Sequence, residues 1–458
     1  MEPETRATSS FEKDAHKTKD NAHKGKTRSN SLFTISSGFT FFAALPGGSN
    51  SSSFRMEKLR SFQPKRRGLD FKQLNQDFAD EQYEVFLSRL SVEVHVLAQN
   101  AFLPGGSTRA TRMSPWLKEY PEEFLKYVEL VARPDARSGQ WERLLRNGDE
   151  RVNLIAAIIF RILDKSIFSA LLFGAGPKHS ETLRNIDTAF INAEGFDRSS
   201  LLSHTSRRWL RGNNGEPHHF WQEVDKLCTQ TLAMLLPVYD YVKETAVFKP
   251  ISTSELYQAL HDVIAHAGWV SVCIRMSPAV VSIDWNIPGE TFSTELINMS
   301  QEAYEASKDA AKAHEASLEL ARQYQMAIAG SSSEPKPEVR HVRSAPRVKI
   351  TVTPKMVRHK PLPKDVNAMG ITSYTIMKPS VVFYEGFKLE QDERKAYISL
   401  PDYIQKLRDR NCVPYNTALI IMAVALVSLW VLYTTSGQQT WQIVQRWLQS
   451  VLRYGAML

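Results

Sequence analysis

The stretch ALIIMAVALVSLWVLYTT, residues 418–435, decides the architecture expected for the chain. Nine of its residues are Leu, Ile or Val, and no Asp, Glu, Lys or Arg occurs between Arg410 and Arg446. A helix of about 18 residues is roughly 27 Å long, which nearly matches the hydrocarbon thickness of a bilayer. The stretch predicts one C-terminal transmembrane helix, bounded at residues 416–436.

A second apolar run, Leu154–Phe173, differs because it carries three charged residues, Arg161, Asp164 and Lys165. Each charge costs about 2.5–3.5 kcal/mol at the centre of a bilayer, so this run is predicted to be a core helix of a globular domain. For residues 418–435 a fully buried core helix is the alternative. Four aromatic residues with a polar edge argue against this alternative, because such residues collect at membrane interfaces: Trp430, Tyr433, Trp441 and Trp447.

The composition is that of a globular protein with two or three domains. The chain has 458 residues, of which 43% are hydrophobic and 23% charged. The formal net charge of +8 favours anionic partners, but the excess is concentrated in linkers. Cys228, Cys273 and Cys412 are far apart and include no CxxC pair, so the sequence indicates neither a disulfide framework nor a zinc site and fits a reducing compartment.

Helical periodicity predicts one helical domain at residues 69–329. Its clearest helices are expected at Asp149–Phe173, Phe220–Lys243 and Thr253–Val272. The last of these has a start signal, because Ser252, Thr253 or Ser254 can cap it and Glu255 supplies an acidic first turn. No strand alternation in this region is strong enough to suggest a βαβ unit.

Within the segment Pro288–Ala329, one Ala-rich helix of about 32 residues is predicted. Small and apolar residues recur in it every seven residues, as in a coiled coil: Leu296, Ala303, Ala310, Ser317 and Tyr324, with Met299, Ala306, Ala313, Leu320 and Ala327. One interpretation is that the 296–327 helix mediates oligomerisation or binds an unknown protein partner. The alternative is that it packs along its own domain as the last member of a bundle.

The region after this helix is basic, with nine Lys or Arg between Lys336 and Lys364 against Glu338 alone. Such a strip can lie on an anionic lipid surface, and a solvated linker is the alternative. Nucleic-acid binding is not expected, because the strip lacks interleaved aromatic residues.

Three stretches downstream are β-prone: Arg347–Thr353, Ser373–Met377 and Ser380–Tyr384. The fold class expected is therefore mainly α, with an all-α helical domain, a small β-containing module and one transmembrane helix. In order, the chain is expected to hold a disordered tail at 1–68, the helical domain at 69–329, a basic linker at 330–346, the β-module at 347–400, a juxtamembrane helix at 401–415, the transmembrane helix at 416–436 and an amphipathic tail at 437–458.

No motif of the common enzyme classes occurs, since GxxxxGK[ST], GxGxxG, HExxH and GxSxG are all absent. No catalytic, cofactor-binding or metal-binding residue is assigned, and the sequence leaves open whether the helical domain is an enzyme. His261 and His266 lie about 140° apart around a helix and are predicted to be buried or capping histidines. The loop Asp284–Glu290 pairs Trp285 with two carboxylates, and we assign it no catalysis.

Two candidate sites remain. In the sequence SRRWLR, three arginines can clamp a phosphate beside an aromatic ring: Arg207, Arg208 and Arg211. The alternative is a charged helix edge whose Trp209 lies in the core. Cys412, beside the predicted membrane entry, is a candidate for S-palmitoylation, with an unmodified thiol as the alternative.

The expected function is that of a membrane-tethered helical interaction or scaffold protein, because enzyme motifs are absent and the 296–327 helix has a small-residue seam. The alternative is a membrane-associated enzyme with an unfamiliar all-α active site. A deep pocket lined by converging ionisable groups would favour the enzyme.

The orientation expected is that of a single-pass, tail-anchored protein with the bulk of the chain in the cytosol. Lys406, Arg408 and Arg410 precede the span closely, whereas only Arg446 and Arg453 follow it, which fits the positive-inside rule. The endoplasmic reticulum and the outer mitochondrial membrane fit the sequence equally well.

Overall fold

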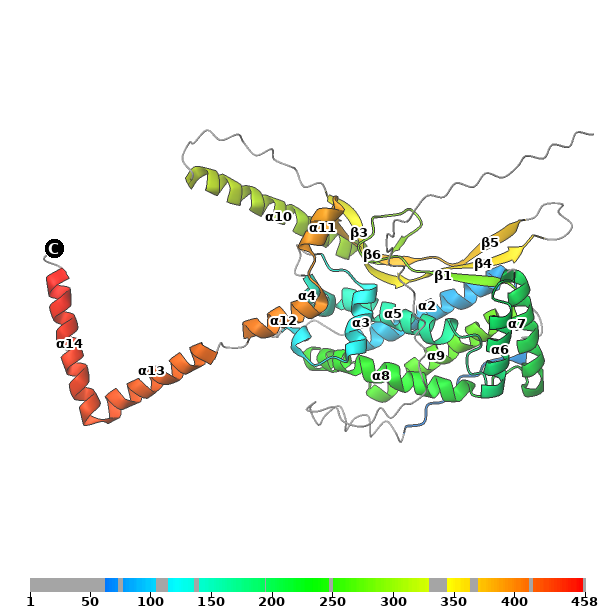
Figure 1. Cartoon of the computed structure of the whole chain (residues 1–458), viewed down its shortest axis with the longest axis horizontal. Coiled ribbons are helices and arrows are strands. Elements are labelled where there is room, and N and C mark those ends of the chain that lie inside the picture. Colours follow the sequence, from blue (N-terminus) through cyan, green and yellow to red (C-terminus); the bar gives the residue numbers. More distant parts are fainter. Residues whose placement is uncertain are drawn as a thin grey trace, which may run out of the picture. The chain divides into compact units, whose positions relative to one another are not determined.

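The computed structural model describes residues 62–72, 77–103, 114–135, 140–193, 195–246, 250–328, 344–362, 370–411 and 415–455. Helices make up most of this part of the chain, and six strands form two three-stranded sheets (Figure 1). The predicted mainly helical fold with a small β component is therefore confirmed. Of the predicted disordered tail, residues 1–61 lie outside the described part.

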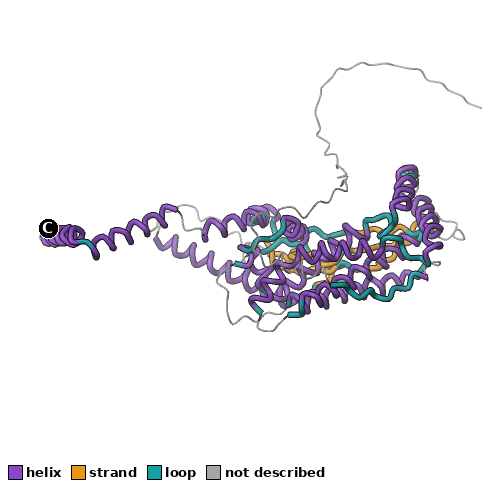
Figure 2. Tube along the Cα trace, turned by 90° about the horizontal axis from the view of Figure 1, so that it is seen from below, coloured by secondary structure: helices purple, strands orange, loops and turns teal. Residues whose placement is uncertain are grey.

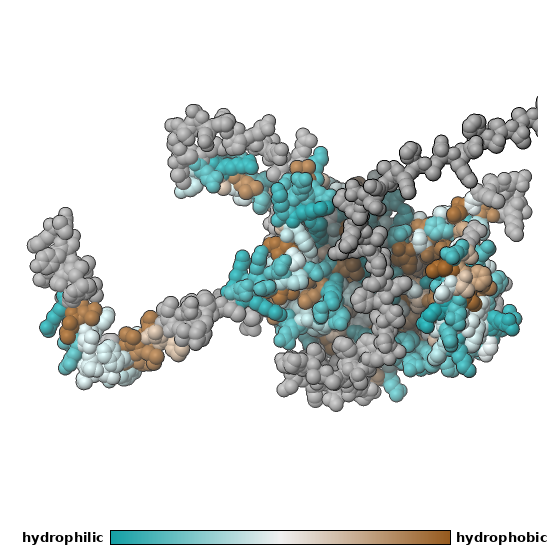
Figure 3. Space-filling view, viewed as in Figure 1, coloured by the Kyte–Doolittle hydropathy of each residue, from teal (hydrophilic) through white to brown (hydrophobic). Residues whose placement is uncertain are grey.

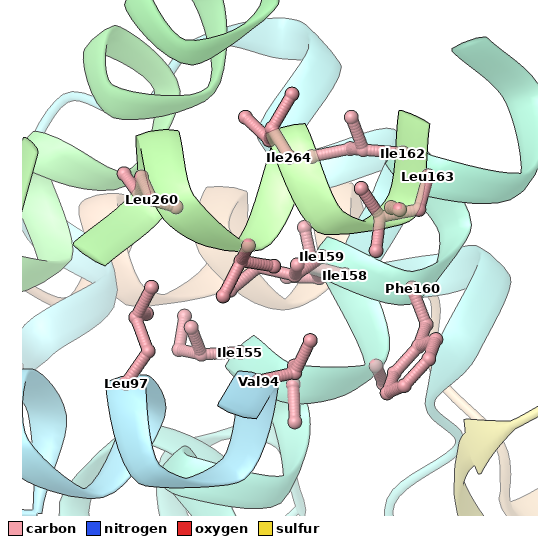
Figure 4. Close-up of a cluster of buried hydrophobic side chains, with 14 of the residues drawn as sticks. Val94, Leu97, Ile155, Ile158, Ile159, Phe160, Ile162, Leu163, Leu260 and Ile264 are labelled. Carbon is pink, nitrogen blue, oxygen red and sulfur yellow. The ribbon is translucent and has the colours of Figure 1, made fainter. Parts of the chain in front are cut away.

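The helix α5, Gly148–Leu163, lies in the hydrophobic core and is buried along nearly its whole length. It packs against α2, Asp80–Phe102, while α9, Thr253–Met276, packs against α2 and α8, Phe220–Thr245. Apolar side chains from three of these helices meet in the core (Figure 4): Val94 and Leu97, Ile155, Ile158 and Ile159, and Leu260 and Ile264. Since neighbours surround α5, apolar residues on every face of it are stabilising.

Side-chain caps define where the core helices begin. The side chain of Asn147 accepts hydrogen bonds from the backbone N–H groups of Asp149 and Glu150 at the start of α5. Ser252 and Glu255 form a reciprocal capping box at the start of α9, which confirms the predicted start signal. The predicted core helix ends earlier than Phe173, because a π-helical turn, Asp164–Phe168, follows α5.

Four further helices lie between these elements: α3, Glu122–Val131; α4, Gln140–Arg146; α6, Pro177–Ala189; and α7, Gly195–Leu210. The last two pack side by side (Figure 1). Arg198 links them, since its Nε donates to Asp187 Oδ1 at 2.8 Å.

The two sheets have the strand orders β1-β4-β5 and β2-β6-β3. The strands are β1, Val280–Asp284; β2, Ile297–Asn298; β3, Ser344–Thr353; β4, Lys355–Pro361; β5, Ile371–Met377; and β6, Ser380–Phe387. The three β-prone stretches correspond to β3, β5 and β6, whereas β1 and β2 lie in a region where no strands were expected. β1 pairs antiparallel with β4, and β2 pairs parallel with β6.

The sheets lie on one side of the helices, with β3 against α5 and β5 against α2 (Figures 1 and 2). Ile350 and Val352 of β3 and Met356 of β4 are buried in the same hydrophobic cluster as α5. The strands therefore share the core of the helices.

A buried ionic group joins β3 to α5. Lys349 Nζ lies 2.6 Å from Glu150 Oε2, and Arg143 Nε lies 2.8 Å from Glu150 Oε1. The side chains of Lys349 and Glu150 are only 3% and 0% exposed. Burial lowers the pKa of Lys349, because the charged form loses its hydration.

A second ionic group joins β4 to the helices. The buried guanidinium of Arg358 donates to Asp77 Oδ2 at 2.5 Å, to the side chain of Asp80 and to the Ser277 hydroxyl at 2.5 Å. It also lies 4.6 Å from the ring centre of Tyr83. These contacts fix the sheet against α2 and the end of α9.

The long helix α10 is Gln301–Ile328, so the helix predicted at 296–327 begins later than expected. Ile297 and Asn298 instead form β2, where pairing with β6 satisfies their backbone hydrogen-bonding groups. Two positions of the predicted heptad series, Leu296 and Met299, consequently precede the helix.

The two halves of α10 have different surroundings. Ala303, Ser307 and Ala311, spaced four residues apart, are buried where α10 packs on β6. From Glu315 to Gln325 every side chain is exposed. The first turns therefore pack on the chain's own fold, while the second half makes no such contact among the described residues.

The remaining helices are α11, Glu390–Ala396; α12, Leu400–Asn411; α13, Tyr415–Tyr433; and α14, Thr435–Gly455. The helix α12 lies where a helix was expected at 401–415, and it ends at Asn411. Within the described residues no helix is both long and apolar enough to cross a membrane, so the predicted transmembrane helix at 416–436 is not supported by the structure. Cys412 lies outside the described residues.

Candidate anion-binding cleft

The end of α7 is held by a tight turn. A 3-10 turn, Arg211–Asn213, follows the helix, Asn214 adopts a left-handed backbone with φ 51°, and the Gly215 N–H donates to Leu210 O at 3.0 Å. Gly215 has φ +87°, and a Cβ there would lie 2.3 Å from the carbonyl oxygen of Phe71. Only glycine permits this close approach between the turn and the segment around Phe71.

The turn and that segment enclose a cleft with a volume of about 140 Å³. Its described lining comprises Phe71, Lys72, Arg207, Leu210, Arg211, Asn214, Gly215 and Met276. Three of these side chains are cations and none is a carboxylate. The volume is below the roughly 300–1,000 Å³ of pockets that hold drug-sized molecules, so the cleft suits a small polar group.

Arg207 anchors the cleft. Its Nε donates to Met276 O, at the end of α9, at 2.8 Å. Its Nη2 is buried and has no hydrogen-bond partner among the described residues. A buried cationic donor without an acceptor is unfavourable, so the described residues leave this donor one hydrogen-bond acceptor short.

The three predicted arginines are divided by the structure. Arg207 and Arg211 line the cleft and Arg208 does not, although Arg208 and Arg211 are both exposed. Arg207 and Arg208 are adjacent on α7 and differ by about 100° around its axis, whereas Arg211 reaches the cleft from the 3-10 turn after the helix. Trp209 is not in the core, since it is 45% exposed and stacks on His179 with ring centres 5.0 Å apart.

Lys72 is the lining cation that sequence reasoning missed. It belongs to a segment far from α7 in sequence, and the close approach of the Gly215 turn to Phe71 brings the two together. Nothing in the local pattern around Lys72 indicates this contact.

The predicted buried histidines are confirmed. His266 Nδ1 lies 2.8 Å from Glu93 Oε2, and His261 Nε2 lies 3.2 Å from Asp225 Oδ1. Arg67 donates to both oxygens of Glu93 at 2.8 Å. Burial opposes ionisation of Glu93, but the hydrogen bonds from His266 and Arg67 hold its pKa well below its usual range.

The Asp284–Glu290 loop is also structural. The guanidinium of Arg161 lies 3.8 Å from the ring centre of Trp285, and the indole N–H donates to Asp164 Oδ2 at 2.8 Å. Glu290 accepts a hydrogen bond from the Ile287 N–H at 3.0 Å. In the described part of the chain, no group of three or more His, Cys, Asp or Glu side chains could hold a metal ion.

Comparison with protein-family models, with curated proteins and with solved structures finds no match to this chain.

Proposed function

We propose that this chain is a membrane-tethered interaction or scaffold protein, held through residues 418–435. The observation that carries the proposal is the absence of any charged residue between Arg410 and Arg446. Nine Leu, Ile and Val residues contribute about −3 to −5 kcal/mol to insertion, with no charge to oppose it.

The exposure of the described side chains in α13 is consistent with this proposal. Large apolar residues from Met422 to Tyr433 are 44% to 81% exposed. At 100° per residue they fall around the whole circumference of the helix. Figure 3 shows the described part of this apolar surface that faces the viewer, in brown. An apolar helix exposed on all sides needs a cover, and a bilayer covers all sides equally.

The orientation follows from flanking charge and from α14. Lys406, Arg408 and Arg410 favour a cytosolic position for the residues before the span. After it, Trp441, Ile443 and Val444 are exposed on α14, so this helix fits an interfacial position on the far side. In this orientation Cys412 lies at the cytosolic entry, where a palmitoyl group can attach.

The second half of α10 is the proposed contact for a protein partner. Its heptad positions Ala313, Ser317, Leu320 and Tyr324 are exposed, the last two by 66% and 70%. Small residues in such a seam let a second helix approach closely. A partner helix with a complementary heptad seam would cover them, and cross-linking from this surface tests for it, including a second copy of the chain.

The enzyme alternative has weaker support. The cleft at Arg207 is too small for a drug-sized substrate. A second hollow of about 530 Å³ lies beside Arg89 and is lined largely by basic residues, of which Arg67 already pairs with Glu93. Neither hollow presents the nucleophile and adjacent base of a common catalytic pair.

Alkaline carbonate extraction of membranes from cells expressing the full chain tests the tether. We expect the chain to stay in the pellet, and Val424→Arg with Leu429→Arg to release it, because two arginines cost about 5–7 kcal/mol at the bilayer centre. Gln438→Arg with Gln442→Arg adds the same charge outside the span and should leave the chain in the pellet.

The same membranes report the orientation. Protease added outside should digest residues 69–329 and spare a tag after Leu458. The tether would be refuted if carbonate released the unmodified chain, or if the Val424/Leu429 variant stayed in the pellet. The orientation would be refuted if residues 69–329 were protected from the protease.

A further inference from the structure

We infer that the cleft formed by Lys72, Arg207 and Arg211 binds a phosphate-bearing group. This inference goes beyond the proposed tether and does not depend on it. Two observations carry it: three cations from two distant segments line one small cleft, and a buried N–H of one of them has no partner among the described residues.

The C-terminal ends of α7 and α9 explain only part of this arrangement of cations. Cations near the last turns of α7 and α9 complement the partial negative charge of the helix C-termini. That accounts for Arg207 Nε, which donates to Met276 O at 2.8 Å. It does not account for the unpartnered Nη2, nor for Lys72, which belongs to neither α7 nor α9.

The chemistry of the lining favours phosphate. Guanidinium groups present several N–H donors in a planar fork that matches phosphate oxygens, and a lysine adds a point charge. The amide of Asn214 adds a neutral hydrogen-bonding group at the rim. Phe71, Leu210 and Met276 supply apolar walls, which reduce competition from water and strengthen the charge-assisted bonds.

The size of the cleft limits what enters it. At about 140 Å³ it admits the phosphate group and leaves the remainder of a larger ligand outside. A free phosphorylated metabolite and the headgroup of a phosphorylated lipid share this chemistry. The experiment therefore compares the two sources.

Binding is measured by isothermal titration on the full chain in detergent, with inorganic phosphate and with a short-chain, water-soluble phosphatidylinositol phosphate as separate probes. We expect Lys72→Gln and Arg211→Gln each to weaken binding about tenfold, since each removes one charge-assisted contact. Arg208→Gln removes the same charge from the neighbouring exposed position and should bind as the unmodified chain does.

Binding of both probes supports a site for the phosphate group alone, and binding of the lipid analogue alone supports a headgroup site. No binding of either probe would overturn the inference. Equal loss in Arg208→Gln and Arg211→Gln would also overturn it, because it would show attraction to general positive charge. Detergent-solubilised protein is used throughout, so failure of the membrane tether would not affect the result.

Discussion

Replacing Glu150 by leucine should destabilise the chain more than any exposed charge replacement. The change leaves Lys349, whose side chain is 3% exposed, without the carboxylate that lies 2.6 Å from it. Removing one partner of a buried ion pair costs about 3–5 kcal/mol. At about 2–4 °C per kcal/mol for a domain of this order of size, the melting temperature should fall by roughly 6–20 °C.

Companion variants distinguish a loss of stability caused by an unpaired charge from one caused by altered packing. Lys349→Met should cost less, because Glu150 keeps Arg143 at 2.8 Å. The double variant Glu150→Leu/Lys349→Met should regain much of the lost stability, since it leaves no uncompensated buried charge at these two positions. Glu122→Leu breaks the exposed pair with Lys126 and should leave the melting temperature unchanged.

The assay is thermal unfolding of the full chain in detergent, followed by far-ultraviolet circular dichroism. A double variant as unstable as Glu150→Leu alone would refute the reasoning, because the loss would then come from packing rather than from an unpaired charge. An equal fall in Glu122→Leu would refute it as well.

Two further predictions concern stability. Gly215→Ala should lower the urea unfolding midpoint by an amount equivalent to more than about 1 kcal/mol, since alanine disfavours positive φ and its Cβ would meet Phe71 O at 2.3 Å. Gly212→Ala is the control, because a Cβ at Gly212 would have nothing within 4 Å. Equal midpoints for the two variants would contradict the prediction. Glu93 has a folded pKa below the ordinary 4.5, so its stabilisation is complete above that pH and is lost as the pH falls below it. Glu93→Gln should therefore flatten the fall in stability below about pH 4.5, and parallel pH profiles for the two chains would exclude this linkage.

Local signals in the sequence predicted several elements well. The capping residues Ser252 and Glu255 and the apolar face that follows them set the start of α9 without help from distant residues. The alternation of Arg347–Thr353 likewise predicted β3. In both cases the information lies within a few residues of the element.

Elements that depend on distant pairing were missed. β1 has only five residues, and its partner β4 follows about 70 residues later, so no local pattern predicts this strand. The start of α10 was misplaced for the same reason, because pairing of Ile297 and Asn298 with β6 overrides the helical pattern. In the cleft, helical spacing could have separated Arg208 from Arg207, but the contribution of Lys72 could not be found from the sequence.

The ionic link between Glu150 and Lys349 also imposes an order on biosynthesis. The carboxylate is in α5, and its lysine leaves the ribosome roughly 200 residues later, which at about 5–20 residues per second is a delay of about 10–40 s. During that interval the nascent helices lack the strands that share their core, and Glu150 lacks one of its two counter-charges. The helical layer therefore cannot complete its folding vectorially from the N-terminus, and it depends on a segment that emerges only shortly before the apolar stretch at residues 418–435.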